Sequence, residues 1–281
     1  MTTRTGSALI EQMNATTAPH GSLALWWLGQ MGIAIKGSHT VLYFDPYLTG
    51  RLPADAQPGE IWVRAFPPPL LPHEVSNAAA VLCSHEHGDH TDPGTLRGIA
   101  AASPAASFVI SGWAQPQADQ AGIAPQRRIL ARSTPISIGE FTITPVAAAH
   151  VTREFDEQRG ERWMGFLVEG NGVVLYHSGD TVHFDGYFEQ MRALPTADLA
   201  VVASNGRDAR RDSHDILGNF NPAEAAWAAQ QLGWDTLIFG HNDLFAFNSQ
   251  SPGSMAEAVA TVHPRQKWHT LQPGEMFLYV K

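Results

Sequence analysis

The chain has 281 residues, 18 of them basic and 27 acidic, and a formal net charge of −9. This length can bury a large core, and no Gly/Ser run, charge block or repeat marks a linker, so we expect a single domain over residues 1–281. The acidic balance argues against a nucleic-acid partner, which needs a basic stripe. One cysteine excludes an intramolecular disulfide, and no apolar run approaches the ~18 residues of a membrane span. We therefore expect a cytoplasmic protein with no membrane partner.

The first half of the chain predicts a short polar N-terminal helix followed by strands bounded by Gly and polar turns. These strands are expected at residues 23–29, 32–37, 40–46, 78–84 and 107–112. The run at 78–84 is continuously apolar, which is typical of a strand buried on both faces. Residues 49–71 are rich in proline and predict an irregular excursion, and 93–103 predicts a helix with Pro93 near its start.

The second half begins with two strand-rich segments, 141–150 and 162–180, the latter with a hairpin turn at 169–172. Helices and strands then alternate. The helices are expected at 184–193, 222–232 and 253–262, and the strands at 198–204, 236–241 and 275–280. Helix 222–232 has the clearest ends, because Asn221 and Glu224 form a capping box and Gly233 follows the last turn. The order predicts two mixed halves packed into one α/β sandwich.

The stretch "LCSHEHGDHTD" at 82–92 crowds histidines and aspartates directly behind a predicted buried strand. It contains His85-x-His87-x-Asp89-His90. A loop that opens at the end of a strand lets several side chains converge, and imidazole and carboxylate are the ligands that zinc, manganese and iron accept in hydrolytic sites. This spacing is far more specific than a polar loop with scattered histidines, so it predicts a metal site.

In this stretch the sequence resembles the metallo-β-lactamase superfamily, whose signature is His-x-His-x-Asp-His after a buried strand. The resemblance runs from Trp27 onward and implies the four-layer αββα metallo-β-lactamase sandwich. His150 after "VAAA", Asp180 in "YHSGDT" and His241 in "IFGHND" match further ligands of that family, in its order. Asp45 in "LYFDPYLTG" matches its first acidic motif.

The resemblance implies two divalent metal ions, zinc or manganese. One would be held by His85, His87 and His150. The other would be held by Asp89, His90 and His241, with Asp180 between the two. Asp89, Asp180 and His241 would serve catalysis, and Asp45 would accept a hydrogen bond from a ligand imidazole. In such centres a metal-bound hydroxide attacks an electrophilic carbon or phosphorus.

Several other polar residues flank these motifs and are candidates for supporting the ligands or contacting substrate. They are His177, His183, Asn205, Arg207, Asn242 and Asp243. For His177 the sequence leaves two alternatives, a side chain that lines the site or one that packs in the protein core. The Arg-rich segment 205–215 predicts a loop over the site that could grip an anionic substrate through Arg207 or a neighbouring arginine, although a solvated loop is the competing interpretation.

His87 distinguishes this chain from the flavodiiron oxygen reductases of the superfamily, which carry glutamate there, and so favours hydrolysis. The phrases "WWLGQMGI", "LYHSGDTVHFDGYF" and "IFGHNDLFAFNSQSP" are similar to the L-ascorbate-6-phosphate lactonase group. That resemblance implies a cytoplasmic enzyme that opens a small lactone and can assemble into a homo-oligomer. We therefore expect a small-molecule substrate, possibly anionic or sugar-derived. A phosphodiesterase of the phospholipase D-like kind and a non-catalytic metal-binding protein are the alternatives.

Overall fold

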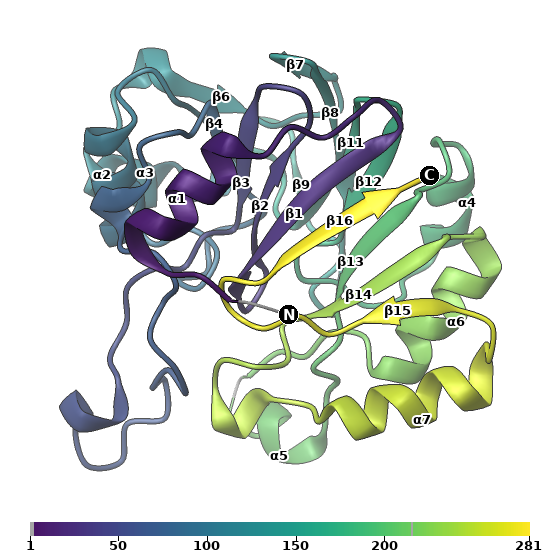
Figure 1. Cartoon of the computed structure of the whole chain (residues 1–281). Helices are drawn as coiled ribbons and strands as arrows, with labels where there is room; N and C mark the ends of the chain where they lie inside the picture. Colours follow the sequence, from purple (N-terminus) through teal and green to yellow (C-terminus); the bar gives the residue numbers. More distant parts are fainter. Residues whose placement is uncertain (1–2, 215) are drawn as a thin grey trace.

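A computed structural model describes residues 3–214 and 216–281, which contain two seven-stranded sheets (Figure 1). The first sheet has the order β16 (Met276–Val280), β1 (Ser22–Gly29), β2 (Gly32–Lys36), β3 (Val41–Phe44), β4 (Ala80–Cys83), β5 (Ser107–Ile110), β6 (Arg128–Leu130). The second has the order β15 (Lys267–His269), β14 (Thr236–Gly240), β13 (Leu199–Ala203), β12 (Val173–His177), β11 (Met164–Gly170), β8 (Phe141–Ala147), β7 (Ile136–Ile138). A small hairpin, β9 (Phe155–Asp156) and β10 (Gly160–Glu161), lies apart from both.

Both sheets combine antiparallel and parallel pairs, as their connections require. Strands β1, β2 and β3 pair antiparallel, and so do β7, β8, β11 and β12. The remaining strands of each sheet continue in parallel, except that the C-terminal β16 returns antiparallel to β1. The β11–β12 turn consists of Asn171 and Gly172, whose positive φ values of 51° and 80° suit a tight hairpin.

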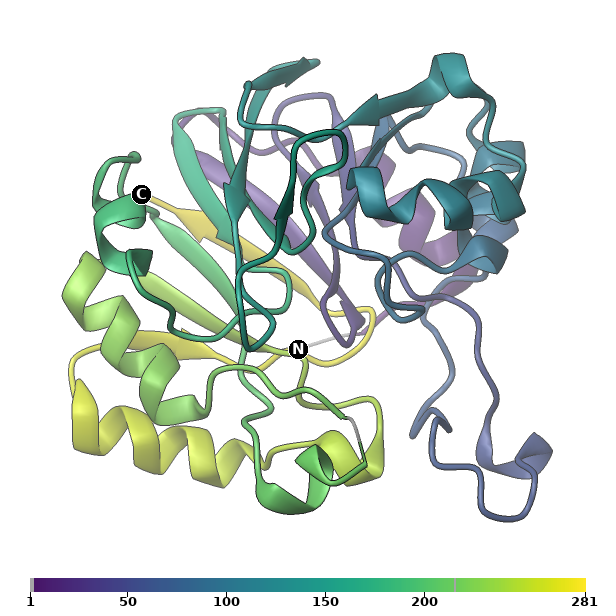
Figure 2. The same ribbon diagram turned by 180° about the vertical axis from the view of Figure 1, so that it is seen from behind.

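Helices cover the outer face of each sheet. Figures 1 and 2 show one set beside the first sheet and another beside the second. The first set is α1 (Gly6–Ala15), α2 (Pro93–Ala102) and α3 (Gln115–Ala121), and the second is α4 (Tyr187–Arg192), α6 (Pro222–Leu232) and α7 (Pro252–Val262). A short helix, α5 (Ala209–Asp212), lies in the loop after β13. The described residues also form 3₁₀ turns at Pro53–Asp55, Pro72–Glu74, Gly112–Ala114, Pro125–Arg127 and Ala246–Asn248.

Three layers of buried side chains hold these elements together. One cluster joins the inner faces of both sheets and contains Trp27, Phe44, Phe166 and Ile238. A second packs the first sheet against α1, α2 and α3, and a third packs the second sheet against α4, α6 and α7. The predicted four-layer αββα sandwich is therefore confirmed.

The structure corrects some predicted boundaries and adds short elements. Strand 141–150 ends at Ala147, the hairpin predicted in 162–180 consists of β11 and β12 and ends at His177, and helix 184–193 begins at Tyr187 after Gly186 adopts a left-handed φ of 88°. Segment 205–215 contains α5 within its described residues. The sequence analysis missed α3, β6, β7, β9, β10 and β15. Most of these are three residues or shorter, and so short a strand is defined by its partner rather than by its own periodicity.

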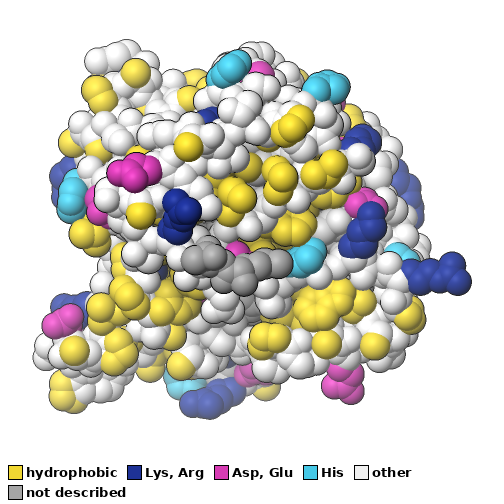
Figure 3. All heavy atoms as spheres, viewed as in Figure 1, with side chains coloured by type: hydrophobic (Ala, Val, Ile, Leu, Met, Phe, Trp, Pro, Cys, Tyr) yellow, Lys and Arg dark blue, Asp and Glu magenta, His cyan; other side chains and the backbone are white. Residues whose placement is uncertain are grey.

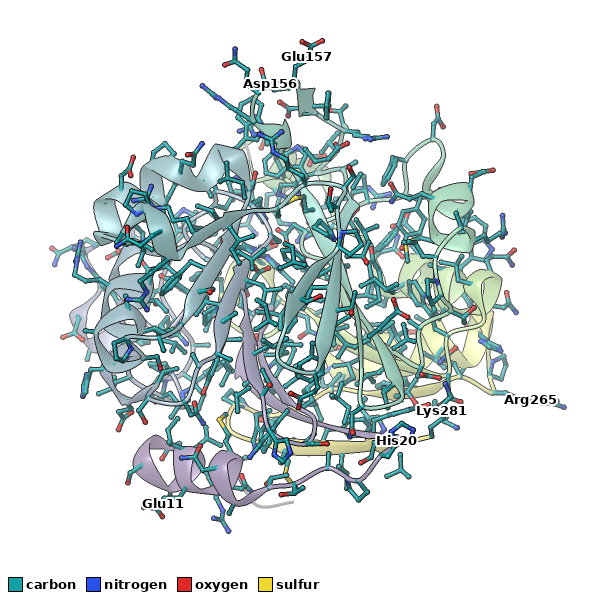
Figure 4. All side chains as sticks on the ribbon, turned by 90° about the horizontal axis from the view of Figure 1, so that it is seen from above. Glu11, His20, Asp156, Glu157, Arg265 and Lys281 are labelled. Atoms are coloured by element: carbon teal, nitrogen blue, oxygen red, sulfur yellow. The ribbon has the colours of Figure 1, made fainter. Side chains whose placement is uncertain are left out.

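The surface carries features that lie outside the sandwich. The segment between β3 and β4 projects away from the two sheets (Figure 2). Asp156 and Glu157 stand at the outer tip of the β9–β10 hairpin and point away from the body (Figure 4). On the face shown in Figure 3, Lys and Arg side chains are scattered rather than gathered into a stripe. Within residues 3–214 and 216–281, no helix has the length and apolar character needed to cross a membrane.

Gly179 is the glycine on which the loop after β12 depends, and its substitution provides a test of the packing. Its φ is 56°, and a Cβ there would clash with the Met164 carbonyl oxygen and lie 2.8 Å from Ser84 Cβ. We expect Gly179→Ala to lower the free energy of unfolding of the metal-free protein by about 3 kcal/mol in urea denaturation. Gly186→Ala is the matched control, because its φ is 88° but nothing lies within 4 Å. It should cost about 1 kcal/mol. If both variants lost the same free energy of unfolding, the argument that Gly179 is required by its close packing would be contradicted.

Candidate metal centre

The polar motifs of the sequence meet at one end of the two sheets. Each follows the carboxyl end of a strand, and in parallel arrangements these ends share an edge. Asp45 follows β3, His85–His90 follow β4, His150 follows β8, Asp180 follows β12 and His241 follows β14. The strands thus bring residues that are far apart in the sequence to one place between the sheets.

These residues form two groups whose donor atoms are close enough to hold an ion. In the first group, His85, His87 and Asp180 each offer one atom, and these atoms lie within 4.8 Å of one another. In the second group, Asp89, His90 and His241 do the same. Imidazole nitrogens and carboxylate oxygens are a donor set suited to zinc, manganese or iron.

Asp180 connects the two groups. Its Oδ1 lies 3.3 Å from His90 Nε2, and its Oδ2 lies 3.3 Å from His241 Nε2. The same Oδ2 lies 3.7 Å from His150 Nε2. Asp180 thus belongs to the first group and also lies beside two histidines of the second, so it would be available to ions held by either group.

His150 lies at the edge of the first group. Its ring centroid is 5.2 Å from that of His87 and 5.8 Å from that of His85. The structure therefore brings together all seven residues for which the sequence predicted a role as metal ligands. His150 stands slightly apart from the tight cluster made by His85, His87 and Asp180.

The residues present fit a metal ion. Among the described residues, His85 Nε2, His90 Nε2 and Asp180 Oδ1 are buried and make no hydrogen bond of good geometry, although His90 Nε2 and Asp180 Oδ1 are close enough, at 3.3 Å, to form an ion pair. Buried polar atoms normally find a partner, because leaving one unsatisfied costs about 1–3 kcal/mol. These two imidazole nitrogens and one carboxylate oxygen lie close together, and a divalent ion bound between them would satisfy all three.

Asp45 and Ser84 fix the orientation of His90. The Asp45 carboxylate is fully buried, accepts hydrogen bonds from Ser84 N at 2.7 Å and Ser84 Oγ at 2.6 Å, and lies 2.8 Å from His90 Nδ1. With Nδ1 donating to Asp45, Nε2 of His90 is left free and faces the centre. Asp45 thus makes the contact with an imidazole that the sequence analysis expected of it.

Three residues at the centre have strained backbones. Gln30, Asp45 and His241 have φ values of 63°, 40° and 58°, in the left-handed region that residues other than glycine rarely adopt. His241 N donates to Gln30 O at 2.6 Å, so two of these turns support each other. Each such conformation costs about 1–3 kcal/mol and persists only where the surroundings enforce it.

The two groups differ in their preferred protonation. Burial lowers the pKa of His85 well below its usual value, and burial lowers that of His150 to about 4. For His90 and His241 burial acts in the same direction, but the neighbouring carboxylates, Asp180 foremost, outweigh it. They raise the pKa of His90 well above its usual value and that of His241 to about 9. Without metal, the first group holds neutral imidazoles and the second holds imidazolium ions paired with carboxylates.

Residues 41–242, well over half of the chain, match the model of the β-lactamase superfamily domain. The chain belongs to the metallo-β-lactamase superfamily. Its relatives include proteins described as metal-dependent hydrolases. That of Pelotomaculum thermopropionicum is 28% identical over 89% of this chain and 96% of its own. That of Korarchaeum cryptofilum is 25% identical over 89% of this chain and 97% of its own.

Solved structures of low sequence identity share the fold of this metallo-β-lactamase-superfamily protein. An isothiocyanate hydrolase from Delia radicum gut bacteria aligns with a TM-score of 0.70 at 16% identity, covering 92% of this chain and 100% of its own. The metallo hydrolase Igni18 of Ignicoccus hospitalis aligns with a TM-score of 0.65 at 17% identity, covering 92% of this chain and 98% of its own. At these identities the likeness concerns the fold alone.

Two of the flanking candidates in this superfamily member support the fold behind the centre. His177 is buried between the sheets, with Nε2 2.9 Å from the Met31 carbonyl oxygen. Asp243 accepts hydrogen bonds from Trp27 Nε1 at 2.7 Å and Gln30 N at 2.9 Å. Neither contacts the two groups directly. Asp243 acts on the centre through the turn that carries Gln30.

Other flanking candidates are not brought to the metal centre. His183 packs in an aromatic cluster with Phe188 and Trp227. Asn242 Nδ2 contacts Met255 Sδ at 3.3 Å, on the side of α7.

Arg207 requires a correction. Its two terminal nitrogens donate to Glu224 at 2.7 and 2.6 Å, and Nη1 also donates to the Asn219 carbonyl oxygen. Its guanidinium is therefore occupied by the start of α6 and is not available as the anion grip that the sequence suggested. Asn205 is buried in a network of amides that reaches the cavity residue Asn248 and is considered below.

Besides Ser84, whose Oγ lies 3.0 Å from His85 Nδ1, the sequence analysis missed Gln30 and Trp163. Gln30 Nε2 lies 2.7 Å from Asp89 Oδ2 and 3.0 Å from His241 Nε2. Trp163 packs its ring 5.1–5.2 Å from those of His85, His87 and His150. Gln30 stands in the hairpin "LGQMG", where the turn itself was the only available signal. Nothing in the spacing of Trp163 marks it.

A cavity of about 360 Å³ opens onto both groups. Its floor is formed by residues of the metal centre, and its walls are mostly aromatic or aliphatic. The floor contains His87, Gly88, Asp89, His150, Asp180 and His241, and the walls contain Tyr47, Trp62, Ile216, Leu217, Phe245 and Asn248. Among the described residues that line it, none is Lys or Arg.

The protonation pattern of the centre is testable by pH titration of the metal-free protein with ¹⁵N-labelled histidine. The pKa of His241 is raised to about 9, so its cationic form is present at pH 7 and is lost as the pH rises through about 9. His150, with a pKa lowered to about 4, should stay neutral until the pH falls through that value. Adding Zn²⁺ at pH 7 should convert His241 to the neutral form, since only the neutral imidazole ligates a metal. His241→Gln assigns the resonance. Titration of both residues near pH 6.5 would contradict the analysis.

Proposed function

We propose that this metal-dependent hydrolase opens a small, uncharged cyclic ester. The observation that carries the proposal is the cavity of about 360 Å³, whose floor is the metal centre and whose walls are mainly apolar. Its size suits a small molecule, and apolar walls with a few polar groups are typical of such sites. The choice of a cyclic ester as the substrate class rests on the resemblance of the sequence to the lactonase group.

The residues of the centre would have different roles in such a reaction. Divalent ions, when bound, acidify a water molecule and polarise a carbonyl oxygen. His85, His87 and Asp180, with His150 beside them, would hold one ion, and Asp89, His90 and His241 the other. Asp45 would keep the tautomer of His90 fixed through its 2.8 Å contact with Nδ1.

Asp89 is the carboxylate of the centre that faces the cavity. Its side chain is 17% exposed and lines the cavity, whereas the side chain of Asp180 is only 4% exposed. Gln30 Nε2 donates to Asp89 Oδ2 at 2.7 Å and so orients this carboxylate. Burial raises the pKa of Asp89 and the imidazoles of His90 and His241 lower it; the imidazoles prevail, so the group is ionised at neutral pH and presents an anionic oxygen to a bound ion.

The walls support an uncharged substrate. Trp62 contacts Phe245 and Phe247 edge to face, with ring centroids 5.2 and 5.0 Å apart, and forms an aromatic side of the cavity with Phe245. Ile216 and Leu217 add aliphatic surface. Such walls exclude bulk water and accept a hydrocarbon ring, and the described lining residues include no Lys or Arg that could pair with a phosphate. This favours a neutral lactone over a sugar phosphate.

A substrate panel tests this assignment. Zn²⁺- or Mn²⁺-loaded protein should hydrolyse δ-valerolactone, and His87→Ala should lower kcat/KM by about 100-fold or more because an imidazole of the first group is lost. His39→Ala removes an exposed histidine far from the centre and should behave as the wild type. Turnover of bis-p-nitrophenyl phosphate alone would favour the phosphodiesterase, and turnover of phenyl isothiocyanate alone would indicate a different electrophilic carbon. Metal binding without any turnover would indicate a non-catalytic protein.

Isotope labelling tests for a covalent intermediate. Burial, followed by the nearby carboxylate of Asp45, raises the pKa of the Cys83 thiol, so this side chain is no nucleophile. Direct attack by water should therefore place ¹⁸O in the product carboxylate and leave the enzyme unlabelled when single turnover is run in ¹⁸O-water. Label found in the enzyme and absent from the first product would mean attack by an enzyme carboxylate. An acylated protein in the intact mass spectrum of an acid-quenched turnover would mean a serine or cysteine acyl-enzyme.

A further inference from the structure

Asn248 is a wall residue of the cavity whose side chain is held from behind by a buried polar network. The side-chain Oδ1 accepts a hydrogen bond from Arg211 Nη1 at 2.6 Å and another from Asn205 Nδ2 at 2.8 Å. Asn248 is 5% exposed and Arg211 is 6% exposed, so both contacts are shielded from water. Because water does not compete for these two hydrogen bonds, they keep the Asn248 side-chain amide in a single orientation.

The hydrogen-bonding capacity of the neighbouring groups determines the orientation of the Asn248 amide. A guanidinium nitrogen can only donate, so the amide atom facing Arg211 must be the oxygen. Asn205 is fixed in the same way, since its own Oδ1 accepts from Asn219 Nδ2 at 2.9 Å and leaves Nδ2 to donate to Asn248. The Asn248 amide therefore cannot flip without losing both of its bonds.

This arrangement leaves Nδ2 of Asn248 free. Within residues 3–214 and 216–281, no protein acceptor takes a hydrogen bond from it, although Oδ1 of the same side chain accepts two. Among the side chains that line the cavity outside the metal centre, Asn248 is the one whose polar orientation is set by two hydrogen bonds. The positive charge of Arg211 on Oδ1 also polarises the amide and makes Nδ2 a stronger donor.

We propose that Asn248 is a specificity-determining residue that donates a hydrogen bond from Nδ2 to an uncharged carbonyl oxygen of the substrate. Arg211 is a positioning residue, because it acts only through Asn248. The inference rests on the proposed function for the identity of the substrate, but the donor and its orientation follow from the network itself. It also gives a role to segment 205–215: its arginine orients a neutral donor instead of binding an anion.

Alternative roles for Arg211 are limited by its contacts. Nε donates to Asp208 Oδ2 at 2.7 Å, and Nη1 donates to the Asn205 carbonyl oxygen at 3.1 Å as well as to Asn248. Asp208 also caps α5 by accepting from Arg210 N and Arg211 N, each at 3.0 Å. The charge of Arg211 is thus balanced by Asp208, so the cavity receives a polarised amide and no net cation.

The test uses a probe that is not consumed. δ-Valerolactam presents the same ring carbonyl as δ-valerolactone but is far more resistant to hydrolysis, and its Kd can be measured by ligand-observed NMR on metal-loaded protein. Asn248→Asp keeps an acceptor for Arg211 and Asn205 but replaces the donor with an acceptor, and Asn248→Ala removes the amide. Each should weaken lactam binding about tenfold and raise KM for the lactone similarly, with kcat little changed.

Two further variants separate positioning from general structure. Arg211→Met leaves Asn248 in place but frees its amide, so lactam binding should weaken about three- to tenfold. Arg210→Ala is the matched control, since Arg210 is exposed on the same short helix and does not contact Asn248. Its Kd should equal that of the wild type. The metal content of every variant should be unchanged.

The outcomes are distinct for the two proposals. Lactam binding that depends on Asn248, in a protein that turns over no lactone, would support the donor and reject ring opening. Asn248→Ala that binds the lactam as tightly as the wild type would overturn the inference, and so would wild-type protein that does not bind the lactam. Loss of metal from Asn248→Ala would also overturn it, because the residue would then belong to the metal centre.

Discussion

One carboxylate, that of Asp180, joins the two halves of the candidate metal centre, and its position depends on how the two sheets pack. Its oxygens lie 3.3 Å from His90, which is carried by the first sheet, and 3.3 Å from His241, which is carried by the second. The buried side chains between the sheets, Trp27 and Phe166 among them, set this separation. A small shift of one sheet against the other would pull the two histidines apart, so the packing of the core determines the geometry of the site.

Much of the centre could be predicted because its residues follow apolar strands in a fixed order. A strand end is visible in sequence as an abrupt change from apolar to polar residues, and His85, Asp180 and His241 all stand just beyond such a change. The capping box at Asn221 and Glu224 and the glycine at 233 likewise defined α6, because caps are local and their chemistry can be read directly. Local signals of this kind were sufficient for two mixed halves in one α/β sandwich, whereas the four-layer arrangement and the roles of Asp180 and His241 were implied by the family resemblance.

What the sequence could not provide was the direction in which a side chain points. Arg207 and Arg211 are four positions apart in one polar segment, yet one is bound to Glu224 and the other reaches the cavity wall through Asn248. Gln30 acts at the centre because a left-handed turn aims it there, and no residue pattern encodes that direction. Contacts between distant segments decide such cases, and a periodicity argument does not include them.

The walls and the floor of the cavity are built from different parts of the chain. The floor stands at strand ends that are locked into the core, whereas Tyr47 and Trp62, Ile216 and Leu217, and Phe245 and Asn248 come from three loops. Loops tolerate insertion and replacement far better than strand ends do. Evolution can therefore exchange the substrate while the reactive chemistry is inherited intact, and relatives that share this centre are free to have diverged in what they consume.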